Sequence, residues 1–163
     1  MLGRVHGSAC DLTTAGRIAE TVWRRLPDRW PHLTVEPFRV MPNHMHGVLQ
    51  WYTDDPASPP EVASALPTLG QVMRAFKGAS ARIIGQAGPS GFAWQRGYYE
   101  HVIRTPKALN AITAYIEANP LLWSVDRENP DRFPASSAQI AHALAQHGPL
   151  ADEELELLTK HIL

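Results

Sequence analysis

The chain has 163 residues with a formal net charge of −1, and 44% of its residues are hydrophobic while 19% are charged. This length predicts one domain with a sizeable core, and the composition excludes a disordered chain. The single cysteine, Cys10, excludes an internal disulfide and a cysteine-rich zinc site, which favours a reducing, cytoplasmic compartment. No apolar run reaches membrane-spanning length, so no membrane partner is expected.

The charges are distributed unevenly. A net charge near zero argues, taken alone, against a nucleic-acid-binding protein. Between Thr68 and Lys107, however, Glu100 is the one acid that opposes six basic residues, and acids predominate after Ala108. The basic residues are Arg74, Lys77, Arg82, Arg96, Arg104 and Lys107. They indicate a local anion-binding surface, with a scatter of solvated charges as the simpler alternative.

The first half of the chain predicts a helix followed by two strands. Thr13 and Thr14 are typical helix caps, and apolar residues recur at helical spacing from there to about Leu26. Residues 35–41 predict a strand with an irregular start at Pro37, and residues 44–51 predict a second strand after a turn. We expect these two strands to form an antiparallel hairpin, followed by a surface loop over residues 52–67.

The second half predicts two helices with a strand between them. One helix begins at Thr68 and ends in the glycines at 85–88, and another begins at Thr105 and ends at Pro120. Residues 92–104 include a strand that places residues 99, 101 and 103 on one face. Weaker helical patterns follow at 138–146 and 152–161. Together these elements favour an α+β fold with helices on one face of a sheet.

Two histidines in the second strand of the hairpin have the spacing of metal ligands. Side chains alternate along a strand, so His44 and His46 point the same way while Met45 points into the core. Two imidazoles on one face form half a metal site. A pair of half-exposed strand histidines without a ligand is the alternative.

Tyr115 and Asn119 are four residues apart on the last predicted helix and therefore share a face. The Asn119 carboxamide oxygen is a hard ligand that suits magnesium or manganese, and Tyr115 is a candidate nucleophile beside such a metal. The spacing alone better supports the alternative, in which Tyr115 is a core residue and Asn119 caps the helix end.

Three sequence blocks occur in the order of a known family. They are VMPNHMHG (residues 40–47), WQRGYYEHVIR (residues 94–104) and YIEANP (residues 115–120). The chain resembles, over roughly residues 2 to 130, the REP-associated tyrosine transposases within the insertion-sequence family of single-tyrosine HUH transposases. We therefore treat residues 1–130 as a transposase-like domain and residues 131–163 as a helical extension of unknown role.

The resemblance implies a fold, a site and a reaction. The fold is a ferredoxin-like sandwich with a central antiparallel sheet. His44, His46 and Asn119 hold Mg²⁺ or Mn²⁺, and Tyr115 attacks single-stranded hairpin DNA to leave a 5′-phosphotyrosine link and a free 3′-hydroxyl. The six basic residues are then expected to contact phosphates, and the protein to be a monomer or homodimer.

The chain also departs from this family. Members usually begin with a strand ahead of a segment like Leu2-Gly3-Arg4, and we expect that strand to be missing. A catalytically decayed or domesticated hairpin-DNA-binding protein is therefore the alternative function.

Some aromatic residues and one histidine have competing interpretations. Tyr98 and Tyr99 are rival nucleophiles, ranked below Tyr115 because neither is predicted to lie on a helix with a potential ligand one turn away. With Trp94 they could stack on bases, although a core position is favoured for all three. His101 is a further polar candidate, best explained as a strand histidine with satisfied hydrogen bonds.

Overall fold

The computed structural model describes residues 1–52, 66–88, 91–133, 136 and 142. The predicted helical patterns at 138–146 and 152–161 lie outside these residues, apart from His142, as does most of the loop predicted at 52–67. The described residues form a mixed α+β structure. None of the described helices is long and apolar enough to cross a membrane.

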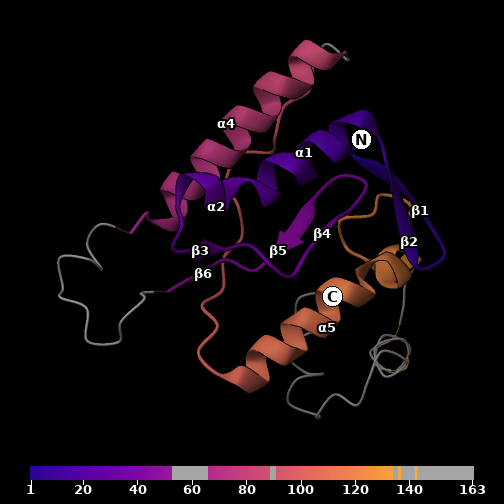
Figure 1. Cartoon of the computed structure of the whole chain (residues 1–163). Helices are drawn as coiled ribbons and strands as arrows, with labels where there is room; N and C mark the ends of the chain where they lie inside the picture. The colour runs from indigo at the N-terminus through magenta and orange to yellow at the C-terminus, as the bar shows by residue number, and fades with distance from the viewer. Residues whose placement is uncertain (53–65, 89–90, 134–135, 137–141, 143–163) are drawn as a thin grey trace.

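Short strands precede the two long helices (Figure 1). In chain order the elements are β1 (Gly3–His6), β2 (Ala9–Leu12), α1 (Thr14–Arg24), α2 (Leu26–Arg29), β3 (Leu33–Thr34), β4 (Phe38–Val40), β5 (Met45–Gly47), β6 (Gln50–Trp51), α4 (Leu69–Ala87), α5 (Pro106–Leu122) and the 3₁₀ turn η1 (Trp123–Val125). The strands pair antiparallel as β1–β2, β3–β6 and β4–β5. The predicted hairpin is therefore confirmed as β4–β5, with β3 and β6 pairing beyond it.

Threonine caps begin the three longest helices, as the sequence predicts. The side chains of Thr13 and Thr105 accept hydrogen bonds from backbone amides in the first turns of α1 and α5. Thr68 forms a reciprocal capping box with Gln71 at the start of α4. The predicted end of the last helix at Pro120 is wrong, because α5 continues to Leu122. Pro120 lies inside α5 and has no amide hydrogen to donate, so the helix continues with one intrahelical hydrogen bond missing.

Helices lie on both faces of the β4–β5 pair, and the expectation of helices on one face is wrong here. Phe38 packs against Trp23 of α1, with ring centroids 6.2 Å apart, and α1 in turn packs against α4. α5 lies on the opposite side of the β4–β5 pair from α1 (Figure 1), and its Tyr115 contacts His46. One face thus joins the main core, and the other holds the candidate site.

Residues 91–104 form no strand, so the strand predicted there is wrong. The alternation of side chains exists in the sequence, but neither face is buried as a strand face would be: Tyr99 is 71% and Val102 64% accessible, while Ile103 is partly buried. A strand needs a neighbouring strand, and none of the strands in the described residues pairs with this segment. β1 and β2 were not predicted, because four-residue strands carry too short a pattern.

Candidate metal centre

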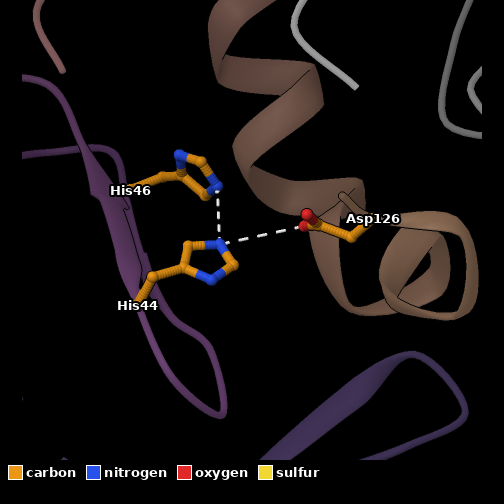
Figure 2. A group of neighbouring side chains, drawn as sticks. All are labelled: His44, His46 and Asp126. Atoms are coloured by element: carbon orange, nitrogen blue, oxygen red, sulfur yellow. Dashed lines mark hydrogen bonds and ion pairs between the residues drawn. The ribbon is translucent and has the colours of Figure 1, made fainter. Parts of the chain in front are cut away.

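The two histidines converge as the strand pattern predicts. Their Nε2 atoms lie 2.9 Å apart, and the two rings are nearly perpendicular at 82°. Both side chains are partly buried, and Met45 between them packs against the main core on the other face. The β4–β5 pair therefore presents two imidazole nitrogens at one point (Figure 2).

Asp126 is the third member of this group, and sequence analysis missed it as a ligand. Its side chain lies just after η1 and is buried, with Oδ2 3.8 Å from His44 Nε2. One ligand atom from each of His44, His46 and Asp126 lies within 4.8 Å of the other two (Figure 2). We call these three residues the histidine–aspartate cluster.

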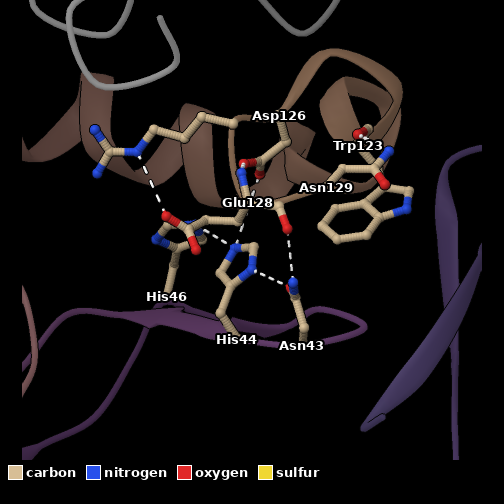
Figure 3. Close-up of polar contacts among 8 residues, drawn as sticks. Asn43, His44, His46, Trp123, Asp126, Glu128 and Asn129 are labelled. Carbon is tan, nitrogen blue, oxygen red and sulfur yellow. Dashed lines mark hydrogen bonds and ion pairs between the residues drawn. The ribbon is translucent and has the colours of Figure 1, made fainter. Parts of the chain in front are cut away.

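Residues 126–129, here called the Asp126 turn, are held in shape by their own side chains (Figure 3). Asp126 Oδ1 accepts a hydrogen bond of 2.8 Å from the Glu128 amide, which leaves Oδ2 facing His44. Asn129 Nδ2 donates to the Trp123 carbonyl at 2.9 Å, and the Trp123 ring lies 6.0 Å from the His44 ring. The carboxylate is therefore fixed in place rather than carried on a free side chain.

Tyr115 lies on α5 beside the histidine–aspartate cluster. Its ring centroid is 5.3 Å from that of His46, and the residue is 9% exposed. Burial raises the pKa of Tyr115 to about 12, and the Asp126 carboxylate adds to the rise. The Asn119 carboxamide opposes part of this pKa shift. Unless a positive charge lies nearby, the side chain of Tyr115 is therefore a neutral phenol.

Asn119 is fully buried, and neither polar atom of its carboxamide makes a hydrogen bond of good geometry. It does not cap the helix end, because α5 continues past it, so this part of the alternative is wrong. The other part is confirmed, because Tyr115 belongs to a cluster of buried core residues. Asn119 lies one turn after Tyr115 on the same side of α5. A buried amide without partners is costly, which makes Asn119 a candidate for a group still to be bound.

The donor set fits a divalent cation. Imidazole nitrogens and a carboxylate oxygen are ordinary ligands of Mn²⁺ and related metals. Adjacent ligands of an octahedral site with bonds of about 2.1 Å lie roughly 3 Å apart, close to the 2.9 Å between the histidine nitrogens. Burial lowers the pKa of His44, although Asp126 and Glu128 oppose the change, and this favours the neutral imidazole that a metal needs.

The six predicted DNA-binding residues are spread over α4, the segment 91–104 and the first turn of α5. Arg74, Arg82, Arg96, Arg104 and Lys107 are exposed. Lys77 instead donates to the backbone carbonyls of Gln95 and Gly97, so it fastens the segment 91–104 to α4.

The aromatic residues divide between core and surface. Trp94 packs against Phe76 and donates to Ser80, which confirms a core position. Tyr98 and Tyr99 are 46% and 71% exposed, so the core position favoured for them is wrong. His101 is exposed and lies in no strand.

Arg39 is a further basic residue near the site that sequence analysis did not single out. It pairs with His46 across the β4–β5 hairpin, and paired residues project from the same face of a sheet. Its Nε atom is buried without a hydrogen-bond partner. The sequence did contain a signal for Arg39. Side chains alternate along a strand, so Arg39 and Met41 should point to one face and Val40 to the other.

The comparisons with known proteins give a relative whose description assigns no function. A protein of Haemophilus influenzae described as uncharacterized is 29% identical over 137 residues, which cover 78% of this chain and 76% of the relative. No protein-family model matches the chain, and no solved structure matches it.

Proposed function

We propose that this protein is a metal-dependent endonuclease and strand-transferase, a transposase of the HUH type, that acts on single-stranded hairpin DNA. The observation that carries the proposal is the contact between Tyr115 and His46, whose ring centroids are 5.3 Å apart although the residues come from α5 and β5. A tyrosine beside two convergent imidazoles and a buried carboxylate supports the proposal, because a cation held by these groups would polarise a phosphoryl group that the phenol attacks. The proposal includes the ferredoxin-like arrangement that the family resemblance implies.

His44, His46 and Asp126 would hold the cation, with the unpartnered Asn119 carboxamide as the further ligand expected from the resemblance. A divalent cation there supplies positive charge that polarises a phosphoryl oxygen and offsets the charge that develops during attack. We propose Mg²⁺ or Mn²⁺ as this cation.

Tyr115 carries out the chemical step. Its Oη forms a bond to the phosphorus while the bond between phosphorus and the 3′-oxygen breaks, so the DNA 5′-phosphate becomes linked to tyrosine. The phenol loses its proton and the departing 3′-oxygen gains one, so the step balances without an oxidant or a nucleotide. Reversal of the step by another 3′-hydroxyl rejoins DNA.

The DNA would lie along the exposed basic residues of α4 and the segment 91–104. Tyr98 and Tyr99 are exposed there and offer rings for base stacking. Arg39 would contact a phosphate close to the reacting bond, because it shares the face of His46.

A covalent-adduct experiment tests the proposal. Purified protein is incubated with end-labelled hairpin DNA and Mn²⁺, and a denaturing gel separates protein-linked DNA from free DNA. We expect an adduct that EDTA prevents and that Tyr115→Phe eliminates. Tyr52→Phe is the matched control, because Tyr52 follows β6 and donates to the Pro31 carbonyl, and both residues lie outside the β4–β5 pair.

Other outcomes count against the proposal. Salt-sensitive DNA binding without any adduct would favour the decayed or domesticated DNA-binding protein. An adduct that persists in Tyr115→Phe would move the nucleophile elsewhere, with Tyr98 and Tyr99 as the first residues to test.

A further inference from the structure

Asn43 joins the turn between β4 and β5 to the Asp126 turn. Its Nδ2 atom lies 2.6 Å from the backbone carbonyl oxygen of Glu128, which is 85 residues away in the sequence. Its Oδ1 atom lies 2.8 Å from Nδ1 of His44. One carboxamide thus contacts both a candidate metal ligand and the segment that carries another (Figure 3).

These two contacts determine where the His44 proton lies. A backbone carbonyl only accepts hydrogen bonds, so the atom of Asn43 that faces Glu128 must be the amide nitrogen. The oxygen of Asn43 then faces His44, and because this oxygen also only accepts, Nδ1 of His44 must carry the hydrogen. A neutral imidazole has one such hydrogen, so Nε2 of His44 keeps a free lone pair.

That lone pair points into the histidine–aspartate cluster. Nε2 of His44 lies 2.9 Å from Nε2 of His46 and 3.8 Å from Oδ2 of Asp126. A metal ligand must present an unprotonated nitrogen, and the other ring nitrogen of such a histidine commonly donates to a neighbouring oxygen. In the metal-free protein Nε2 of His44 has no hydrogen, so His46 must be the hydrogen-bond donor between the two rings.

We infer that Asn43 is a positioning residue, which holds His44 in its ligand tautomer and ties that tautomer to the docked Asp126 turn. The inference rests on the proposed function only in taking His44 as a metal ligand. Loss of Asn43 changes two things together: His44 becomes free to place its proton on Nε2, and the Asp126 turn loses its side-chain bond to the hairpin.

The experiment measures the tautomer and the metal affinity separately, and neither measurement needs DNA. Imidazole ¹⁵N chemical shifts of the full, metal-free chain report which His44 nitrogen is protonated, and calorimetry gives the Mn²⁺ affinity. We expect the Nδ1–H form in the parent protein and a shift toward the Nε2–H form in Asn43→Ala. Removing a group that orients a ligand costs about 10- to 100-fold in metal affinity, and we expect a loss of that size.

Two variants separate orientation from folding. Asn43→Asp keeps an oxygen facing Nδ1 but loses the donor to Glu128, so it should keep the Nδ1–H tautomer. Asn129→Ala removes a hydrogen bond between the Asp126 turn and Trp123 but leaves the Asn43 carboxamide between the Glu128 carbonyl and His44, so the tautomer should again be unchanged. Circular dichroism verifies that each variant is folded.

The results that overturn the inference are specific. A parent protein with the His44 proton on Nε2 contradicts it, as does an Asn43→Ala variant that binds Mn²⁺ as tightly as the parent. If the tautomer and affinity follow expectation but no DNA adduct forms, the proposed function fails while the role of Asn43 stands.

Discussion

Asn119 provides the sharpest test of the site, because its burial should make the metal-free protein less stable than a variant without it. The side chain is 0% exposed, and neither its Oδ1 nor its Nδ2 atom makes a hydrogen bond of good geometry. Asn119→Leu keeps the branch point at Cγ and removes both polar atoms. The variant therefore exchanges two unsatisfied groups for apolar ones.

The magnitude follows from two opposing effects. Each unsatisfied buried group costs about 1–3 kcal/mol, and the larger leucine costs about 1–3 kcal/mol through overpacking. The proximity of Asn119 to Tyr115, which lowers the pKa of the phenol, reduces the gain further. We expect a net stabilisation of about 1–2 kcal/mol without metal, or roughly 2–4 °C in Tm for each kcal/mol in a chain of this size.

Thermal unfolding in EDTA and in Mn²⁺ measures both sides of this prediction. Saturating Mn²⁺ at about 100 times its Kd stabilises a protein by about 2.7 kcal/mol, and the parent should show a gain of this kind. Asn119→Leu should gain less, so its stability advantage over the parent should shrink when metal is added. Asn110→Leu is the matched control, because Asn110 is exposed on the same helix and its change should stay within about 0.5 kcal/mol.

Two results refute this reasoning. If Asn119→Leu is less stable than the parent in EDTA, the carboxamide already has good partners in the folded protein. If both proteins gain equally from Mn²⁺, Asn119 contributes nothing to the metal site.

Three further predictions concern Asp126, Arg39 and Tyr115. Asp126→Asn keeps the side-chain shape but removes the charge, and calorimetry should show Mn²⁺ affinity weaker by about tenfold or more, whereas an unchanged affinity would remove Asp126 from the site. Arg39→Gln should weaken binding of hairpin DNA and reduce the slope of log affinity against log salt by about 0.7, as for one lost phosphate contact; an unchanged slope would exclude that contact. The pKa of Tyr115 is raised from 10.0 to about 12, so its stabilising effect is complete below pH 10 and is lost as the pH rises to 12. Between pH 10 and 12 the ionisation of Tyr115 should lower the free energy of unfolding by about 1.4 kcal/mol per pH unit. Denaturant titrations of the metal-free Tyr115→Phe variant should not show this loss. If the variant loses as much stability as the parent, the pKa of Tyr115 is not raised.

The helices could be predicted because their signals are local. Thr13, Thr68 and Thr105 mark the three helix starts through side-chain bonds to amides within the next few residues. The strands were harder, because pairing depends on distant residues. The alternation at residues 99–104 is as regular as that of a strand, yet Val102 is exposed and the segment lies against α4 through Lys77.

The residues of the candidate site likewise divide into those that a local pattern predicts and one that depends on distant parts of the chain. The shared face of His44 and His46 follows from the period of a strand, and that of Tyr115 and Asn119 follows from the period of a helix. Asp126 follows from neither period. Its position depends on α5 continuing past Pro120 and on η1 turning the chain back toward β5. In the sequence alone, Asp126 is therefore only one of the acids that predominate after Ala108.

The burial of Asp126 is an independent argument for a cation at this point. The residue is 5% exposed, and its carboxylate has one backbone hydrogen bond and one histidine nitrogen 3.8 Å away. A buried carboxylate is costly unless a positive charge compensates it, and burial favours the neutral form of His44. Protonation of His44 would compensate Asp126 but would consume the lone pair that Asn43 directs into the cluster. A divalent cation compensates the carboxylate and accepts that lone pair together, so metal binding should strengthen the docking of the Asp126 turn that Asn43 already provides without metal.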